Sequence, residues 1–207
     1  MVVCDRQFIN GGIKMKSRVK ISNGNSKLGK IPNISLPPIK ACGNCDECRT
    51  DCYALKFYRM YPSVRNAWSV NWNCYRNNPK EYWNAISEYI GKKKPRFFRW
   101  HVAGDIADQT YLDVMAQIAQ SNPETTALVF TKMYNLDYSN LPDNLSVIIS
   151  AWPGKEIHNP FNLPIAFMQD GTETRVENSI ECPGNCEQCG MCFNLKDLGK
   201  NVVFYKH

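Results

Sequence analysis

The sequence contains no long apolar stretch, and this absence excludes a helical membrane-spanning protein. No segment approaches the roughly 20 consecutive apolar residues that a spanning helix requires. The first six residues also lack the basic-then-apolar pattern of a secretory signal peptide. We therefore expect a protein without membrane contact that works in a reducing cytoplasm, where structural disulfides are rare.

The overall composition is that of an ordinary soluble domain. The chain has 207 residues, of which 43% are hydrophobic and 21% are charged, enough for one domain with a hydrophobic core. We expect a single domain over residues 1–207, in which residues 1–41 form an extended lead-in with an edge strand at 18–22. Basic side chains recur along this lead-in, namely Lys14, Lys16, Arg18, Lys20, Lys27 and Lys30.

The net charge of +6 leaves the partners open. A basic lead-in is compatible with binding to nucleic acid or to a host protein, and a positive chain is compatible with an anionic cofactor. However, no aromatic residues alternate with the basic ones, as they do where single-stranded nucleic acid is bound. A solvated surface is the simpler interpretation, and no partner is predicted from the charge alone.

Eight of the ten cysteines lie in two short runs. The run at residues 42–52 has the spacing C-x2-C-x2-C-x3-C of bacterial ferredoxin loops, although Tyr53 stands where ferredoxins carry proline. The run at residues 182–192 reverses these spacings to C-x3-C-x2-C-x2-C, and its first three cysteines have the spacing of radical S-adenosylmethionine enzymes. The candidate metal ligands are Cys42, Cys45, Cys48, Cys52, Cys182, Cys186, Cys189 and Cys192.

Three interpretations compete for these thiols. Short consecutive loops allow three or four thiolates to meet at one 4Fe-4S cluster, so the runs together allow one or two clusters. A zinc site with two cysteines from each run is the alternative, and disulfides are disfavoured in a reducing compartment. We favour iron–sulfur binding. Cys4 and Cys74 lie outside both runs and are predicted to be buried thiols.

Helix signals follow the first cysteine run. The pattern predicts a helix over 53–60 that starts at the cysteine loop, and a second helix that begins at Pro62. Asn78, Pro79 and Glu81 form an N-cap, a first-turn proline and a capping-box glutamate for a third helix that ends at Gly91. Asp108 is predicted to cap a fourth helix.

From residue 96 onward, short apolar strands alternate with helices or loops. Strands are predicted over residues 96–102, 126–131, 145–150, 164–168 and 201–205. Near-continuous apolar strands joined by crossovers indicate a parallel sheet covered on both faces. The expected fold class is therefore α/β, with a small, mostly parallel sheet or partial (βα) barrel, helices and two cysteine-rich cluster loops.

Polar residues gather where these strands end. In the strand at 96–102, alternation predicts Phe98, Trp100 and Val102 on one face and Arg99 and His101 on the other. Ligand sites of parallel α/β proteins lie at the carboxyl ends of the strands. The predicted cofactor pocket at this edge comprises Arg99, His101, Gly104, Asp105, Lys132 and Trp152. In the alternative interpretation these are turn, cap and hydrogen-bonded structural residues.

The chain resembles the phage gene-88-type protein family. The resemblance is carried by residues 24–29, 34–38, 52–56, 61–65, 98–105, 131–132 and 145–154 and by both cysteine runs. It implies a bacteriophage origin and a place of action in the cytoplasm of a bacterial host, and it implies no particular chemistry. Residues 51–54 and the strand ending in Gly104 and Asp105 are also similar to phage proteins with a radical S-adenosylmethionine-like pattern.

The functional hypothesis is a phage-encoded iron–sulfur protein whose clusters are structural, redox-active or radical-generating. Whether it is an enzyme stays open. In the enzymatic alternative, one iron lacks a cysteine ligand and binds S-adenosylmethionine, with Gly104 and Asp105 near the amino group or ribose of this cofactor and Lys132 or Arg99 near its carboxylate. The second alternative is a zinc-stabilised protein that binds nucleic acid or a host protein.

Overall fold

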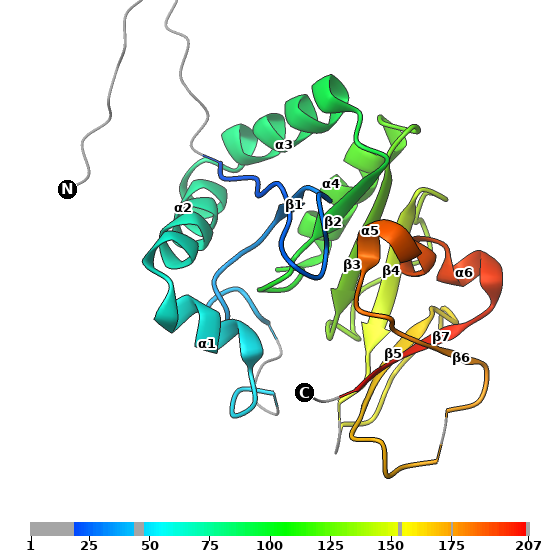
Figure 1. Ribbon diagram of the computed structural model, residues 1–207. Coiled ribbons are helices and arrows are strands. Elements are labelled where there is room, and N and C mark those ends of the chain that lie inside the picture. Colours follow the sequence, from blue (N-terminus) through cyan, green and yellow to red (C-terminus); the bar gives the residue numbers. More distant parts are fainter. Residues whose placement is uncertain (1–18, 44–47, 153–154, 175, 206–207) are drawn as a thin grey trace, which may run out of the picture.

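The fold is an α/β sheet whose strands all run parallel. The computed structural model describes residues 19–43, 48–152, 155–174 and 176–205. Within these residues, seven strands form one sheet in the order β1-β2-β3-β4-β5-β7-β6, and every neighbouring pair is parallel (Figure 1). The predicted fold class is confirmed, and the sheet is entirely rather than mostly parallel.

The helices and strands follow one another along the chain with short connections. The strands are β1 Asn33–Ile34, β2 Phe97–Trp100, β3 Thr126–Thr131, β4 Leu145–Ser150, β5 Ile165–Gln169, β6 Ser179–Glu181 and β7 Asn201–Tyr205. The helices are α1 Tyr53–Met60, α2 Pro62–Asn77, α3 Pro79–Lys93, α4 Gln109–Gln120, α5 Cys186–Cys189 and α6 Leu195–Leu198, with a 3-10 helix η1 at Met191–Phe193. None of the helices in the described ranges is long and apolar enough to cross a membrane.

The strand order explains why the longer helices share one face of the sheet. β1 to β5 lie side by side in chain order, and right-handed crossovers between such strands place their connections on the same side. Side chains from α3 and α4 pack there against β2, including Tyr82, Tyr111 and the fully buried Trp100. This sequential order is that of a partial barrel. The described sheet is nevertheless open, with β1 and β6 at its edges.

The opposite face is covered by two segments that are far apart in the sequence. Phe97, Leu128 and Ile148 of the sheet pack there against residues from the N-terminal lead-in and from the C-terminal part of the chain. These covering residues are Leu28, Ile31, Phe193 and Leu195. Figure 1 shows α5 in front of β3 and β4, with α6 to its right. The second cysteine run therefore belongs to the layer that covers this face.

The predicted helix starts are confirmed, and one predicted helix end is wrong. The Asn78 side chain accepts a hydrogen bond from the Glu81 amide (3.3 Å), and Asp108 caps α4 by accepting from the Tyr111 amide (2.8 Å). The third helix does not end at Gly91 but continues to Lys93, and Lys94 closes it with a φ of 44°. Lysines near a helix C-terminus are favoured by the helix dipole, which outweighs the small helix-breaking effect of one glycine.

The lead-in differs from its prediction. The edge strand predicted at residues 18–22 is reduced to one antiparallel bridge between Ser22 and Asn33, and residues 1–18 lie outside the described part. Instead, Asn33–Ile34 forms β1 beside β2. Leu28, Ile31 and Ile34 are buried, so residues from 28 onward form part of the core rather than an extended arm.

The strand predicted at 96–102 ends early, and this changes two side-chain directions. β2 stops at Trp100 because His101 has a φ of 55°, which breaks the alternation of the pleat. The His101 ring lies 5.3 Å from that of Tyr111 of α4, on the helix-covered side, while Val102 packs with the second-face cluster. The prediction that placed Val102 with Trp100 and His101 with Arg99 is therefore wrong.

Candidate metal centre

The second cysteine run folds back on itself through two short helical turns. Cys182 directly follows β6, and α5 spans Cys186–Cys189. The Asn185 side chain caps α5 by accepting a hydrogen bond from the Gln188 amide (3.2 Å). Gly190 ends α5 with a φ of 62°, a conformation that glycine adopts without strain, and the chain turns there into η1. This reversal returns Cys192 towards the other cysteines.

All four cysteines of this run line one small cavity. The cavity has a volume of about 20 Å³, and Ile180, Phe193 and Val202 form its apolar wall. The four cysteines themselves are half-buried. Among the residues that the structure describes, no group of three or more His, Cys, Asp or Glu side chains is arranged to hold a metal ion. The thiols therefore share a cavity without converging on one point.

Hydrogen bonds attach the second run to distant parts of the chain. The Cys186 amide donates to the Lys27 carbonyl (2.9 Å), and the Lys30 amide donates to the Glu187 carboxylate (2.9 Å). The Ser146 hydroxyl at the start of β4 donates to the Cys192 carbonyl (2.9 Å). The run is thus fixed both to the lead-in and to the sheet.

Burial opposes ionisation of these thiols, and nearby cations offset part of this effect. Desolvation raises the pKa of Cys186, and it raises the pKa of Cys192 to about 12. The Arg99 guanidinium acts in the opposite direction on both thiols, and the Lys27 ammonium also lowers the pKa of Cys186. Cys182 and Cys189 raise both pKa values, as expected for acidic groups that lie close together.

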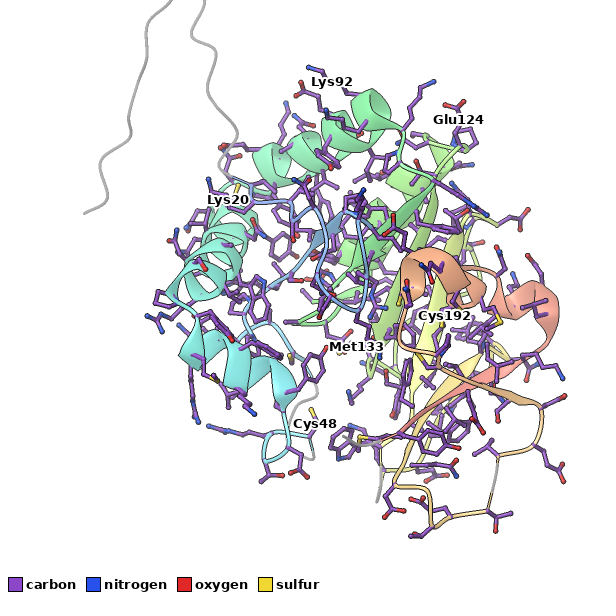
Figure 2. The ribbon with its side chains drawn as sticks, viewed as in Figure 1. Lys20, Cys48, Lys92, Glu124, Met133 and Cys192 are labelled. Carbon is purple, nitrogen blue, oxygen red and sulfur yellow. The ribbon has the colours of Figure 1, made fainter. Side chains whose placement is uncertain are left out.

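The first cysteine run lies beyond the carboxyl end of β1. Cys42, Cys48 and Cys52 lie in the described residues, whereas Cys45 does not. Cys52 directly precedes α1. Tyr53 is 61% exposed, but its hydroxyl reaches inward and donates to the Val102 carbonyl. Figure 2 shows Cys48 near the start of α1 and Cys192 beside α5, so the two runs occupy different places on the fold.

The structure brings three residues of the predicted pocket together, namely Asp105, Lys132 and Trp152. Asp105 is buried, and its two oxygens accept hydrogen bonds from the Ile106 amide (2.7 Å) and the Lys132 amide (2.9 Å). Burial raises the pKa of Asp105, and its hydrogen bonds lower it. The Lys132 ammonium lies 5.2 Å from the Trp152 ring centroid. Asp105 therefore connects the turn after β2 to the end of β3, and it is occupied by structural contacts.

The remaining members of this set lie elsewhere. Gly104 has a φ of 80° and packs so closely that a side chain there would meet Leu36. His101 is 3% exposed on the helix-covered side, and neither of its ring nitrogens has a hydrogen-bond partner within the described residues. Arg99 faces the opposite side of the sheet, with its guanidinium 4.2 Å from the Phe130 ring centroid. The six residues thus do not line one pocket.

A different cavity lies at the carboxyl edge of the sheet. It has a volume of about 330 Å³ and is lined by Gly43, Met133, Tyr134, Asn135 and His158. Gly43 belongs to the first cysteine run, so the cavity lies directly beside it. The predicted pocket includes Lys132 but not the three residues that follow it. Their position directly after a predicted strand is a sequence signal that could have identified them.

Fold and site together define the class of the protein: an open, all-parallel α/β sheet that carries one cysteine run beyond β1 and a second across one face. The chain belongs to the gene product 88 family, whose model matches residues 12–178. The match confirms the resemblance to the phage gene-88-type family and includes the first cysteine run. It ends before Cys182, so the second run lies outside it. Comparison with curated proteins and with solved structures gives no significant match.

Proposed function

We propose that this protein is an iron–sulfur protein that holds 4Fe-4S clusters through its two cysteine runs, in the cytoplasm of a bacterial host. The observation that carries the proposal is the cavity shared by Cys182, Cys186, Cys189 and Cys192, with Arg99 beside it. Four thiols from a segment of eleven residues are a donor set that suits a cubane cluster. When bound, such a cluster supplies one-electron redox chemistry.

The short spacing of the four cysteines favours a cluster over a single zinc ion, because zinc sites usually combine two C-x2-C pairs separated by a longer loop. Four thiolates around one zinc lie about 2.3 Å from the metal and therefore only ~3.8 Å from one another. In a cubane each thiolate binds a different iron, so the sulfur atoms stay further apart. The small cavity of about 20 Å³ has to widen on loading, which couples cluster binding to a local rearrangement of the run.

The chain's own residues prepare the site for an anionic cofactor. Ligation requires all four thiols to lose their protons, and burial makes this unfavourable at Cys192. Arg99 and Lys27 offset part of this cost, because both lower the pKa of Cys186. The apolar wall formed by Ile180, Phe193 and Val202 limits access of water to the bound sulfur atoms.

Anaerobic purification followed by metal and sulfide analysis tests the proposal. We expect iron and acid-labile sulfide in equal amounts, about four or about eight of each per chain, and Mössbauer parameters of 4Fe-4S clusters. If the protein contains zinc but no acid-labile sulfide, the iron–sulfur proposal is wrong and the zinc-stabilised alternative is supported. A colourless, folded protein without bound metal would refute both.

A radical S-adenosylmethionine enzyme is the second candidate, favoured by the 330 Å³ cavity beside Gly43. In this case three cysteines of one run hold the cluster, so that one iron has no cysteine ligand and is open to the amino and carboxylate groups of the cofactor. We expect addition of S-adenosylmethionine to shift the Mössbauer signal of one iron site in the loaded protein. An unchanged spectrum at saturating cofactor would leave only the non-catalytic iron–sulfur protein.

A further inference from the structure

One strand connects the two cysteine runs. Along β2 and the turn after it, three residues contact different parts of the chain. Phe97 stacks on Phe193 of the second run, with a centroid distance of 4.1 Å. At the other end, the Val102 carbonyl accepts the hydrogen bond from Tyr53, which adjoins the first run. Arg99 lies between these two contacts on the same face of the sheet.

The Arg99 side chain is partly buried and held in place by uncharged groups. Its Nε donates to the Trp100 carbonyl (3.0 Å), and its guanidinium stacks on Phe130 at 4.2 Å. Arg99 forms no ion pair within the described residues. The ion pair found there joins Lys94 and Glu124 on the surface. A desolvated cation without a carboxylate partner is costly, so its surroundings point to an anion of another kind.

The acidic groups that interact with Arg99 are thiols and a phenol. Burial lowers the pKa of Arg99, and Tyr53, Cys186 and Cys192 act against this shift. Tyr53 in turn interacts with Cys42, Cys48 and Cys52 of the first run. All these groups are neutral near pH 7 in their ordinary state. They become an anionic environment only when metal binding converts the cysteines to thiolates.

We propose that Arg99 is the shared counter-charge of the two cysteine sites, a positioning residue that sets the reduction potentials of their clusters. This inference rests on the proposed iron–sulfur function. A 4Fe-4S cluster with four thiolate ligands is anionic, and the electron that reduces it adds a further negative charge. A fixed positive charge between the sites therefore stabilises the reduced clusters more than the oxidised ones.

Redox titration of the intact, anaerobically loaded protein tests this role. The variant Arg99→Gln removes the charge but keeps a polar side chain of similar reach. At a solution potential fixed with dithionite, we expect its ratio of reduced to oxidised cluster to fall about tenfold, which corresponds to about 59 mV for one electron. Arg99→Lys keeps the charge, and its midpoint potential should stay close to that of the wild type.

Arg96 supplies the matched control. It lies just before the same strand, and its guanidinium stacks on Phe97 at 4.8 Å, but it is exposed. We expect Arg96→Gln to leave the midpoint potential unchanged. If Arg99→Gln binds no cluster, the Arg99→Lys variant decides. Clusters bound by Arg99→Lys would support the role of the charge, and loss of clusters from both variants would overturn it.

The outcomes also separate this inference from the proposed function. A wild-type protein without iron and sulfide would refute the iron–sulfur function itself. A loaded wild type whose midpoint potential equals that of loaded Arg99→Gln would leave that function standing and refute the role of Arg99.

Discussion

Replacing Cys186 and Cys192 together by serine is expected to halve the iron and acid-labile sulfide bound per chain. Both residues line the cavity of the second run, and serine hydroxyls are poor ligands for iron in place of thiolates. The first run is separate on the fold and should keep its cluster. Iron and sulfide assays on anaerobically purified protein measure the change, and the matched control is Cys74→Ala, which removes a buried cysteine of α2 outside both runs.

Two other results of this substitution are informative. Loss of nearly all iron would mean that the two runs share a single cluster. An unchanged iron and sulfide content would exclude the second run as a cluster site and restrict the proposal to the first run. Because metal binding to such a loop contributes to its stability, we also expect residues 182–192 to become more sensitive to proteolysis in the variant.

The sheet and its main helices could be predicted because their signals are local. The strands at 126–131 and 145–150 are mostly apolar, and their predicted bounds agree with the observed ones. The start of α3 depends on Asn78, Pro79 and Glu81, whose roles follow from their own side-chain chemistry. A parallel sheet then follows from the alternation of such strands with crossovers.

Elements that depend on distant partners could not be predicted. β1 has two residues and β6 has three, too few to show any periodicity, and each exists because a neighbouring strand pairs with it. The covering of the second face has the same origin, because residues 28–31 and 193–195 meet only in the folded chain. The two cysteine runs are visible in the sequence, but the sequence does not show which cysteines share a cavity.

Arg99 illustrates the limit for the site. Its position at the end of a strand suggested a pocket with His101, since alternation places both on one face. The positive φ of His101 cannot be inferred from its side chain, and it sends the two residues to opposite sides of the sheet. Arg99 packs on Phe130 on the face that carries the second cysteine run, whereas His101 is enclosed against α4.

The environment of His101 opposes protonation of its imidazole. Its ring is 3% exposed, lies near the rings of Trp100 and Tyr111, and has no hydrogen-bond partner at either nitrogen within the described residues. Burial, assisted by the positive charge of Arg99, lowers the pKa of His101 from its ordinary 6.5 to about 3. The folded protein therefore keeps this imidazole neutral at a pH where the unfolded chain protonates it.

The sign of the resulting pH dependence is fixed. Between pH 6.5 and about 3 the unfolded state binds a proton that the folded state does not, so stability falls as the pH falls. From pH 7 to pH 5 this group alone should reduce the free energy of unfolding by about 2 kcal/mol. In His101→Phe, which keeps an aromatic ring but cannot titrate, we expect this part of the loss to disappear.

Urea unfolding of the wild type and of His101→Phe at both pH values, under anaerobic conditions, measures the effect. Any pH dependence of bound clusters is common to the two proteins and cancels in the comparison. If His101→Phe loses as much stability between pH 7 and pH 5 as the wild type, the imidazole must be protonated in the folded protein. In that case a hydrogen-bond acceptor or water would have to reach the His101 ring, which the packing of Trp100 and Tyr111 excludes from solvent.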